Sequence, residues 1–500
     1  MSMNTGYGAG LGVRRWGATA VAVGGVIAAL AAGCNEGPGD PDGEGGLGGA
    51  GGSGGSGGSG GPAGGSGGTT GGSGGSNGGS GGSGGTTGGS DGLGGLGGMG
   101  GGTNTDGVWT IVELDGAVCA DGSPYKFFVK RAEESAGLVV TLEPGGACWD
   151  YDTCGGDGTT RAANLEGLGD DHMTALPPPF GADPDAIPWG LMFPHLGVSD
   201  SGVATASYDQ VFLPYCTGDA FVGDFTATYE APGGGDEIEI EHRGAATIEL
   251  VSSWLSGEFA APEHLLVVGS SAGGLGAAFH YARLRDAVSP ERSSFLNDSG
   301  PIFPPGGPQD LARQAFVQFW HTEDLLAELD ERLDAPPAQL LSDDSGHLMA
   351  LLSAAFPDDR FLQTYFLSDL NNSHFNYAGF YPVTSGDDLQ ALWLEDTDVL
   401  VDMIETTDNW GYYLPGFRAD NCSHAVALLP VDELDNPLYA LTALAGNADG
   451  YLRTDLGDLD FADALDSVLA ADGDLLRERA TDPMTDFTDE QETACLDVND

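Results

Sequence analysis

Basic residues are scarce in this sequence. Lysine and arginine together supply 17 of the 500 residues, whereas aspartate and glutamate supply 75, so the formal net charge at pH 7 is −58. A surface with this excess of carboxylates repels nucleic acid phosphates and anionic lipid headgroups. The composition therefore excludes nucleic acid as a partner. It predicts a surface that its carboxylates keep soluble, with calcium binding and adaptation to high salt as the alternatives.

The sequence also lacks an apolar run long enough to span a membrane. The run near its start, Ala18 to Leu30, is shorter than the roughly 20 residues that a spanning helix needs. Arg14 and Arg15 precede this run, and small residues follow it before Cys34. This order of charged, apolar and small residues is typical of an export signal.

The residues before Cys34 resemble a bacterial lipobox, in which the cysteine thiol is acylated and becomes the new N-terminus. They depart from the usual pattern in one respect, because Ala31 stands where leucine is usual and Leu30 comes one place early. We expect residues 1–34 to be a lipoprotein signal peptide, and Cys34 to anchor the exported chain to the bacterial cell envelope or surface. Plain secretion, or a twin-arginine route, is the alternative.

Glycine dominates the segment that follows. It supplies 85 residues of the chain and 30 of those at positions 51–100, mostly in Gly-Gly-Ser and Gly-Gly-Thr repeats. A stretch with almost no charged or aromatic residues cannot bury enough surface to fold. We therefore expect residues 35–106 to be a disordered linker and residues 107–500 to form one large domain.

The cysteines of this domain lack the spacing of a metal site. Cys148 and Cys154 are too far apart for a metal-binding pair, and no second close pair lies near them. An even number of cysteines in an exported chain indicates disulfides. Six cysteines allow many pairings. The three that we predict are Cys119 with Cys216, Cys148 with Cys154, and Cys422 with Cys495.

Strand-like and helix-like segments alternate in the domain. Apolar runs with β-branched residues at 125–130 and 137–142 predict two neighbouring strands, and 236–242 predicts another. A continuous apolar run at 264–268 predicts a buried strand. Segments with helical spacing are 245–255, 272–284, 309–319 and 387–404. Such alternation indicates an α/β fold, with a mostly parallel central sheet covered by helices on both faces.

One turn in this pattern carries a candidate nucleophile. The strand-like run at 264–268 leads into the G-x-S-x-G pattern of residues 269–273, and a helix-like segment follows. Glycines at both ends of this pattern avoid the Cβ clashes of a sharp turn, as in a nucleophile elbow. Ser271 is therefore the predicted nucleophile, with its hydroxyl exposed above a helix N-terminus. The alternative is an ordinary strand-to-helix turn.

A serine nucleophile needs a base and a group that orients the base. In this fold class the order along the chain is serine, acid, histidine. His424 lies in a polar segment beside Cys422 and just before an apolar run, where a disulfide would hold it still. We predict His424 as the base, with His374 as the alternative.

Seven further motifs follow one another between residues 119 and 429. They are Cys119-Ala120-Asp121-Gly122-Ser123-Pro124, Leu142-Glu143-Pro144-Gly145-Gly146-Ala147-Cys148 with Cys154, Pro214-Tyr215-Cys216-Thr217-Gly218-Asp219, Arg243-Gly244, the turn at 269–274, Asp298-Ser299-Gly300 and Cys422-Ser423-His424. Together they resemble the motifs of the pectin acetylesterase/Notum family. The resemblance implies an α/β-hydrolase-like fold and the cleavage of carboxylic esters.

The resemblance also implies which acid orients His424. The family's acid lies in a Phe-Leu-x-x-Asp-like segment, which Tyr365-Phe366-Leu367-Ser368-Asp369 matches best. Asp369 is therefore the predicted acid. Asp298 is the alternative, because it also follows a strand-like run.

The oxyanion hole needs backbone N–H donors about 3 Å from the developing negative charge. We expect one donor from Ala272, next after the nucleophile, and others from the Gly145-Gly146 loop. Pro144 stands where the family has a glycine, and proline cannot donate because it has no N–H.

These residues predict a serine carboxylesterase that needs neither a metal nor an organic cofactor. We expect it to remove acetyl or other short acyl groups from a polysaccharide or another extracellular ester, through a Ser-His-Asp acyl-enzyme mechanism. Residues 101–500 carry a net charge of −55, which repels a polyuronate such as pectin. The alternatives are a catalytically inactive binding or adhesion lipoprotein on the same fold, and a lipase-like hydrolase of longer acyl esters.

Overall fold

The structure, a computed structural model, describes residues 109–135, 137–156, 160–173, 205–334, 344–417, 424–427, 456, 459, 461–481 and 483, which belong to one compact unit. The predictions for the signal peptide at 1–34 with Cys34, for the linker at 35–106, and for Cys422 with Cys495 lie outside these residues. None of the helices in the described ranges is long and apolar enough to cross a membrane.

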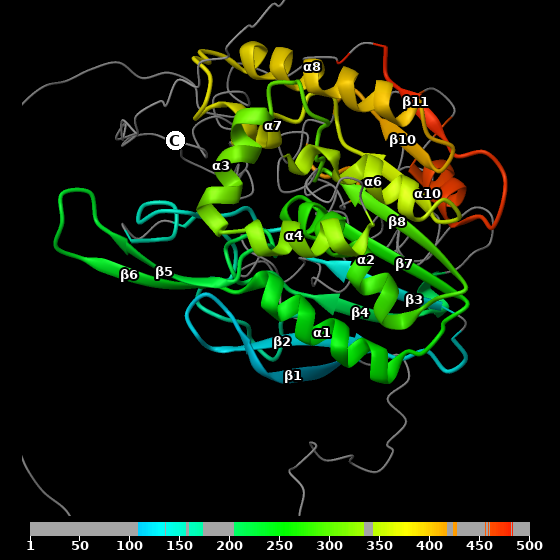
Figure 1. Ribbon diagram of the computed structural model, residues 1–500, viewed down its shortest axis with the longest axis horizontal. Helices are drawn as coiled ribbons and strands as arrows, with labels where there is room; N and C mark the ends of the chain where they lie inside the picture. The colour runs from blue at the N-terminus through cyan, green and yellow to red at the C-terminus, as the bar shows by residue number, and fades with distance from the viewer. Residues whose placement is uncertain are drawn as a thin grey trace, which may run out of the picture. The chain divides into compact units, whose positions relative to one another are not determined.

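A nine-stranded sheet forms the centre of the described part of the chain (Figure 1). Its strands, in spatial order, are β1 (Trp109–Val118), β2 (Pro124–Lys130), β4 (Asp209–Leu213), β3 (Gly137–Leu142), β7 (His264–Ser270), β8 (Arg292–Asp298), β9 (Arg360–Thr364), β10 (Trp410–Leu414) and β11 (Arg477–Arg479). The β1–β2 and β2–β4 pairs are antiparallel, and the other pairs are parallel. The predicted mostly parallel sheet is therefore confirmed.

Helices cover both faces of this sheet. They are α1 (Gly244–Glu258), α2 (Ala272–Val288), α3 (Asp310–Trp320), α4 (Glu323–Arg332), α6 (Leu348–Ala355), α7 (Leu370–Tyr377), α8 (Gly386–Ile404) and α10 (Phe461–Leu469), with short 3-10 helices η4 (Thr205–Ser207) and η5 (Ser345–His347). Side chains alternate along a strand. Leu265 and Val267 of β7 therefore pack in the apolar cluster that includes α1 and α2, whereas Leu266 and Val268 pack in the one that includes α10.

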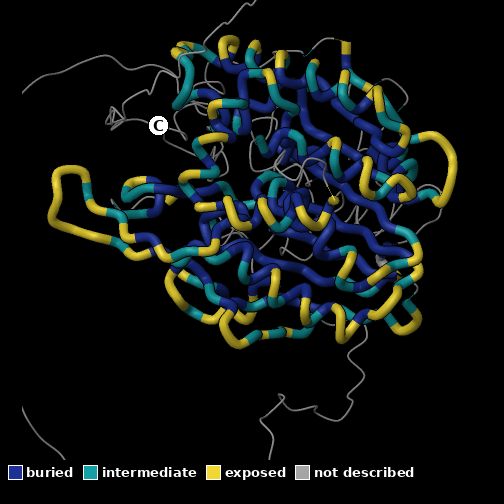
Figure 2. Tube along the Cα trace, viewed as in Figure 1, coloured by how far each residue is buried: buried dark blue, intermediate teal, exposed yellow. Residues whose placement is uncertain are grey.

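Two strand predictions differ from the structure. The strands predicted at 125–130 and 137–142 exist as β2 and β3, but they are not neighbours, because β4 pairs between them. The strand predicted at 236–242 is β6 (Glu237–His242), which pairs with β5 (Phe225–Glu230) in a two-stranded sheet separate from the central one. Figure 1 shows this hairpin extending away from the central sheet, and Figure 2 shows its tip exposed.

Two of the three predicted disulfides are formed in the structure. Cys119–Cys216 joins the β1–β2 turn to the segment after β4, and Cys148–Cys154 closes a loop after β3. Both bonds therefore fasten segments at the same end of the central sheet. The third predicted pair lies outside the described residues.

Candidate active site

The predicted site residues follow the carboxyl ends of four neighbouring parallel strands. Leu142, the last residue of β3, pairs with Gly269 of β7, and Ser270 pairs with Asp298 of β8. Asp298 in turn pairs with Thr364, the last residue of β9. Loops that leave the carboxyl ends of parallel strands meet at one edge of a sheet, which is where α/β folds bind ligands.

Ser271 occupies a sharp turn between β7 and α2. Its backbone has φ 52° and ψ −123°, a region that residues with a side chain rarely adopt. A Cβ on Gly269 would lie 2.1 Å from the Gly273 carbonyl oxygen, and a Cβ on Gly273 would lie 2.2 Å from that of Leu142. Both glycines are therefore required for the close approach of backbone to backbone. Ser271 is half-buried, at the N-terminus of α2.

His424 and Asp369 meet although 55 positions separate them. The Nδ1–H of His424 donates to Asp369 Oδ2 at 3.0 Å, and Oδ1 lies 3.2 Å away. Asp369 is fully buried, and it caps α7 by accepting from the Asn372 N–H at 2.9 Å. The Asn372 side-chain amide donates to Asp369 Oδ2 as well. Asp369 is thus fixed from two sides, and it holds one tautomer of the imidazole.

Asp298 contacts the segment that carries His424 through its backbone. Its Oδ1 accepts from the Val426 N–H at 2.9 Å, and its Oδ2 accepts from the Ala427 N–H at 3.1 Å and from the Ser270 hydroxyl at 3.0 Å. Burial raises the pKa of Asp298 to about 6 against the opposing effect of these hydrogen bonds. Asp298 therefore binds the turn that precedes Ser271 to the segment that follows His424.

The turn formed by Asp298 and Ser299 connects the segments of all three predicted triad residues. The Ser271 N–H donates to the Asp298 carbonyl at 2.8 Å, and the Ser299 hydroxyl accepts from the Ala425 N–H at 3.0 Å. The Asn372 side chain, which binds Asp369, also donates to the Ser299 carbonyl at 2.6 Å. The Asp298-Ser299 turn thus lies at the centre of a network that connects the elements of nucleophile, acid and base.

The three predicted oxyanion-hole donors belong to the loop after β3 and to the start of α2. Gly273 touches the backbone of Leu142 and Glu143, so the start of α2 lies against the loop that contains Gly145 and Gly146. None of the hydrogen bonds between described residues uses the N–H groups of Gly145, Gly146 or Ala272. Gly146 has φ 65°, in the left-handed region. Three backbone donors are therefore available where the loop meets the helix N-terminus.

Sequence analysis missed Asn372 and left the secondary structure around His374 open. Asp369 is the N-cap of α7, and its side chain accepts from the Asn372 N–H. An aspartate followed three residues later by asparagine could have indicated this contact. His374, the alternative base, lies within α7 and not in a loop. An aromatic cluster next to the site was also missed: Trp149 stacks on Phe319, and Phe316 stacks on Phe375.

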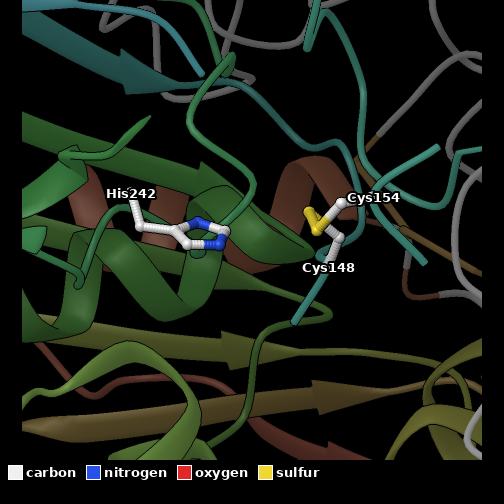
Figure 3. A group of neighbouring side chains, drawn as sticks. All are labelled: Cys148, Cys154 and His242. Atoms are coloured by element: carbon white, nitrogen blue, oxygen red, sulfur yellow. A yellow bond between two sulfur atoms is a disulfide. The ribbon is translucent and has the colours of Figure 1, made fainter. Parts of the chain in front are cut away.

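Cys148, Cys154 and His242 form a group whose potential ligand atoms lie within 4.8 Å of one another. Figure 3 shows the His242 imidazole directed toward the disulfide. Its Nδ1 donates to the Thr217 carbonyl at 2.8 Å and its Nε2 accepts from the Tyr229 hydroxyl at 2.9 Å. Burial lowers the pKa of His242 to about 4. Because the sulfurs bond to each other and both ring nitrogens are engaged, this group offers no free metal ligand.

The comparisons with known proteins agree with the motifs. Residues 205–334, which include the turn around Ser271 and Asp298, match the family model of pectinacetylesterase. This part of the chain resembles the pectinacetylesterase family. The predicted triad residues Asp369 and His424 lie beyond the matched range, so the family model bears on only part of the candidate site.

One curated relative of the chain is the palmitoleoyl-protein carboxylesterase NOTUM of Drosophila melanogaster, 29% identical over 178 residues. The alignment covers 35% of this chain and 24% of that protein, about a quarter of its length. Two crystal forms of the Wnt deacylase Notum from Drosophila are also similar. One has a TM-score of 0.44 at 19% identity, covering 74% of this chain and 96% of that chain, and the other has 0.36 at 17%, covering 61% and 83%.

Proposed function

We propose that this protein is a serine carboxylesterase that removes acetyl or other short acyl groups from a polysaccharide or another extracellular ester. Ser271 is the nucleophile, His424 the base and Asp369 the acid that orients the base. The observation that carries this proposal is the hydrogen bond from His424 to Asp369, on a segment that Asp298 binds to the turn of Ser271. The family match at residues 205–334 and the carboxylesterase named among the relatives support the same class of reaction.

The reaction has two acyl-transfer steps. His424 Nε2 accepts the proton of the Ser271 hydroxyl while the oxygen attacks the ester carbonyl, and His424 then returns the proton to the departing alcohol. Water attacks the acyl-enzyme with the same base, which releases the carboxylic acid and restores the serine. Asp369 holds the proton of His424 on Nδ1, so Nε2 is the nitrogen that accepts.

The oxyanion hole forms between the start of α2 and the loop after β3. The N–H groups of Ala272, Gly145 and Gly146 donate to the carbonyl oxygen as it becomes negative, which is commonly the largest single contribution to this chemistry. Donors held by the backbone lose little freedom when the charge develops. The chemistry requires no metal and no organic cofactor.

The net charge of the chain guides the proposal for the substrate, and the signs of export guide the proposal for the location. We propose a neutral acetylated polysaccharide ahead of pectin, because the net charge of −58 opposes a polyuronate. The two disulfides fit an exported protein. We also propose that lipidation at Cys34 anchors the protein to the cell envelope through the glycine-rich linker.

The decisive experiment compares Ser271→Ala with Ser270→Ala, the neighbouring hydroxyl in the same turn. Wild-type protein should hydrolyse p-nitrophenyl acetate and react with a fluorophosphonate probe. Ser271→Ala should lose both reactions, whereas Ser270→Ala should still be labelled, with turnover reduced because the bond to Asp298 is lost. Activity retained in Ser271→Ala would overturn the assignment of the nucleophile.

Two further measurements separate the alternatives. A folded wild-type protein that neither hydrolyses esters nor reacts with the probe would favour a binding or adhesion lipoprotein. A series of p-nitrophenyl esters from acetate to palmitate should show the highest kcat/KM for acetate. A maximum at long chains would instead indicate a lipase-like hydrolase.

A further inference from the structure

A buried carboxylate–histidine pair, whose carboxylate lies next to the Gly145-Gly146 loop in the chain, takes no part in the proposed triad. Glu143, the first residue after β3, is fully buried, and its Oε1 accepts from the Nε2–H of His172 at 3.0 Å. We propose that Glu143 and His172 are positioning residues that hold the Gly145-Gly146 loop in the geometry of an oxyanion hole. This inference rests on the proposed esterase function, and it identifies how the donors of that site are oriented.

Glu143 joins the loop after β3 to the loop after β4. Its Oε2 accepts from the Tyr215 N–H at 2.7 Å, and its own N–H donates to the Leu213 carbonyl at 3.0 Å. The Tyr215 ring then lies against Gly145, where a Cβ would be 2.3 Å from the ring. Glu143 therefore binds the backbone of the residue whose ring packs against Gly145.

Tyr215 is itself immobilised by further contacts. It is fully buried, its hydroxyl accepts from the Ala220 N–H at 2.7 Å, and its carbonyl accepts from the Asn164 side chain at 2.8 Å. The following residue, Cys216, is bonded to Cys119. Because these contacts hold Tyr215 in place, a shift of Glu143 would change the position of Gly145 relative to the Tyr215 ring.

His172 holds the other oxygen of the Glu143 side chain. Its imidazole stacks on Phe128 at 5.8 Å between ring centroids and contacts Phe212 at 6.3 Å. Burial alone would lower the pKa of His172, but the charge of Glu143 and the hydrogen bond raise it above its ordinary value. The bond is therefore charge-assisted, which makes it stronger than a neutral one.

The physical consequence concerns the placement of the donors. An N–H group stabilises an oxyanion only when it lies at about 2.7–3.1 Å from the charge. Loss of the Glu143 carboxylate removes the acceptor that the buried Tyr215 and His172 N–H groups use, at a cost of roughly 1–3 kcal/mol each. The loop relaxes to satisfy them, and Gly145 and Gly146 move away from the transition state.

The test compares Glu143→Ala, Glu143→Gln and His172→Gln with a matched control. Glu143→Gln keeps an oxygen for the Tyr215 N–H and loses the charge. The control, Asp359→Asn, alters another buried carboxylate, which binds Arg285 and Tyr281 at the opposite ends of the strands. The measurements are kcat and KM for p-nitrophenyl acetate per serine labelled at completion, Ki for a short alkyl trifluoromethyl ketone, and the melting temperature.

We expect Glu143→Ala to lower kcat about 100-fold, the lower limit for loss of one oxyanion donor. Glu143→Gln and His172→Gln should each lower kcat about 10-fold, with KM changed less than about 3-fold in all three. Ki for the ketone should rise as kcat/KM falls, because both report stabilisation of the oxyanion. Asp359→Asn should lower the melting temperature and leave kcat within about 3-fold.

Two outcomes would overturn the inference. In one, Glu143→Gln and His172→Gln fold and keep kcat within about 3-fold of the wild type. In the other, KM rises while kcat and Ki stay unchanged, which would indicate a role in substrate binding alone. A wild-type protein that is inactive on every ester and unreactive with the fluorophosphonate would instead overturn the proposed function itself.

Discussion

The two ends of the central strands each hold a histidine close to a serine, and only one of these ends has the arrangement of a hydrolase. At the amino end, His264 of β7 contacts the Ser294 hydroxyl at 2.9 Å and the Tyr208 hydroxyl at 3.2 Å. At the carboxyl end, His424 donates to Asp369 at 3.0 Å, near the turn of Ser271. The comparison shows which features separate a structural pair from a candidate catalytic one.

The direction of the hydrogen bonds differs between the two ends. The Ser294 hydroxyl donates to the Val468 carbonyl, so it accepts from His264 Nε2 and cannot give that nitrogen a proton. The Nδ1 of His264 faces the Tyr208 hydroxyl, whereas the Nδ1 of His424 faces the Asp369 carboxylate. Burial lowers the pKa of His264 to about 3. Because a buried imidazolium needs a nearby negative charge, His264 cannot serve as a base, whereas His424 can.

The largest expected effect distinguishes the two histidines. His424→Gln should lower kcat for p-nitrophenyl acetate by about 10⁴-fold or more, since it removes the proposed base of the serine. His264→Gln should reduce stability but keep kcat within about 3-fold per labelled serine. Equal losses of kcat in both variants would contradict the contrast between the two ends.

The second expected effect compares a glycine from each end. Gly273→Ala places a Cβ 2.2 Å from the Leu142 carbonyl, and because backbone must move, we expect a loss of about 4 kcal/mol in the free energy of unfolding. Turnover per folded molecule should also fall, because the Gly145 loop moves away from α2.

The matched variant at the amino end is Gly137→Ala. Its Cβ would meet the buried ring of Tyr208 at 2.2 Å, so we expect a loss of about 2 kcal/mol as the ring shifts. Turnover per labelled serine should stay constant, because the ring lies at the other end from Ser271. Urea unfolding and kcat measure both effects, and a fall in turnover for Gly137→Ala would contradict the comparison.

The third expected effect is the pH dependence of stability, which has opposite signs at the two ends. The pKa of Asp298 is raised from 3.8 to about 6 in the folded protein, so its contribution is present below pH 4 and is lost as pH rises through 6. This loss is about 3 kcal/mol. The pKa of His264 is lowered from 6.5 to about 3, so its contribution is present above pH 6.5 and is lost as pH falls.

Variants at the two positions test these signs. Between pH 4 and pH 7, Asp298→Asn should remove the loss of stability that accompanies rising pH. His264→Gln should remove the loss of stability that accompanies falling pH. Urea unfolding at a series of pH values measures both. An unchanged pH dependence in Asp298→Asn would show that its buried carboxylate does not ionise in this range.

The features set by local sequence were predictable. The order of apolar strand, G-x-S-x-G turn and helix predicted β7, the sharp turn and α2, because neighbouring residues determine each of these elements. The α/β class was equally accessible, since it follows from the alternation of buried strands with helices. The order of the strands was not, because β4 enters between β2 and β3 from far along the chain.

By itself, the sequence determined the elbow, the class of fold and a short set of candidate acids and bases. Only the tertiary structure decided which of them meet. Asp298 and Asp369 both follow parallel strands, and no local pattern shows that His424 bonds to Asp369 while Asp298 accepts from the backbone at Val426 and Ala427. These contacts depend on strand order and register, which are properties of pairing between distant segments, and not of the residues taken one segment at a time.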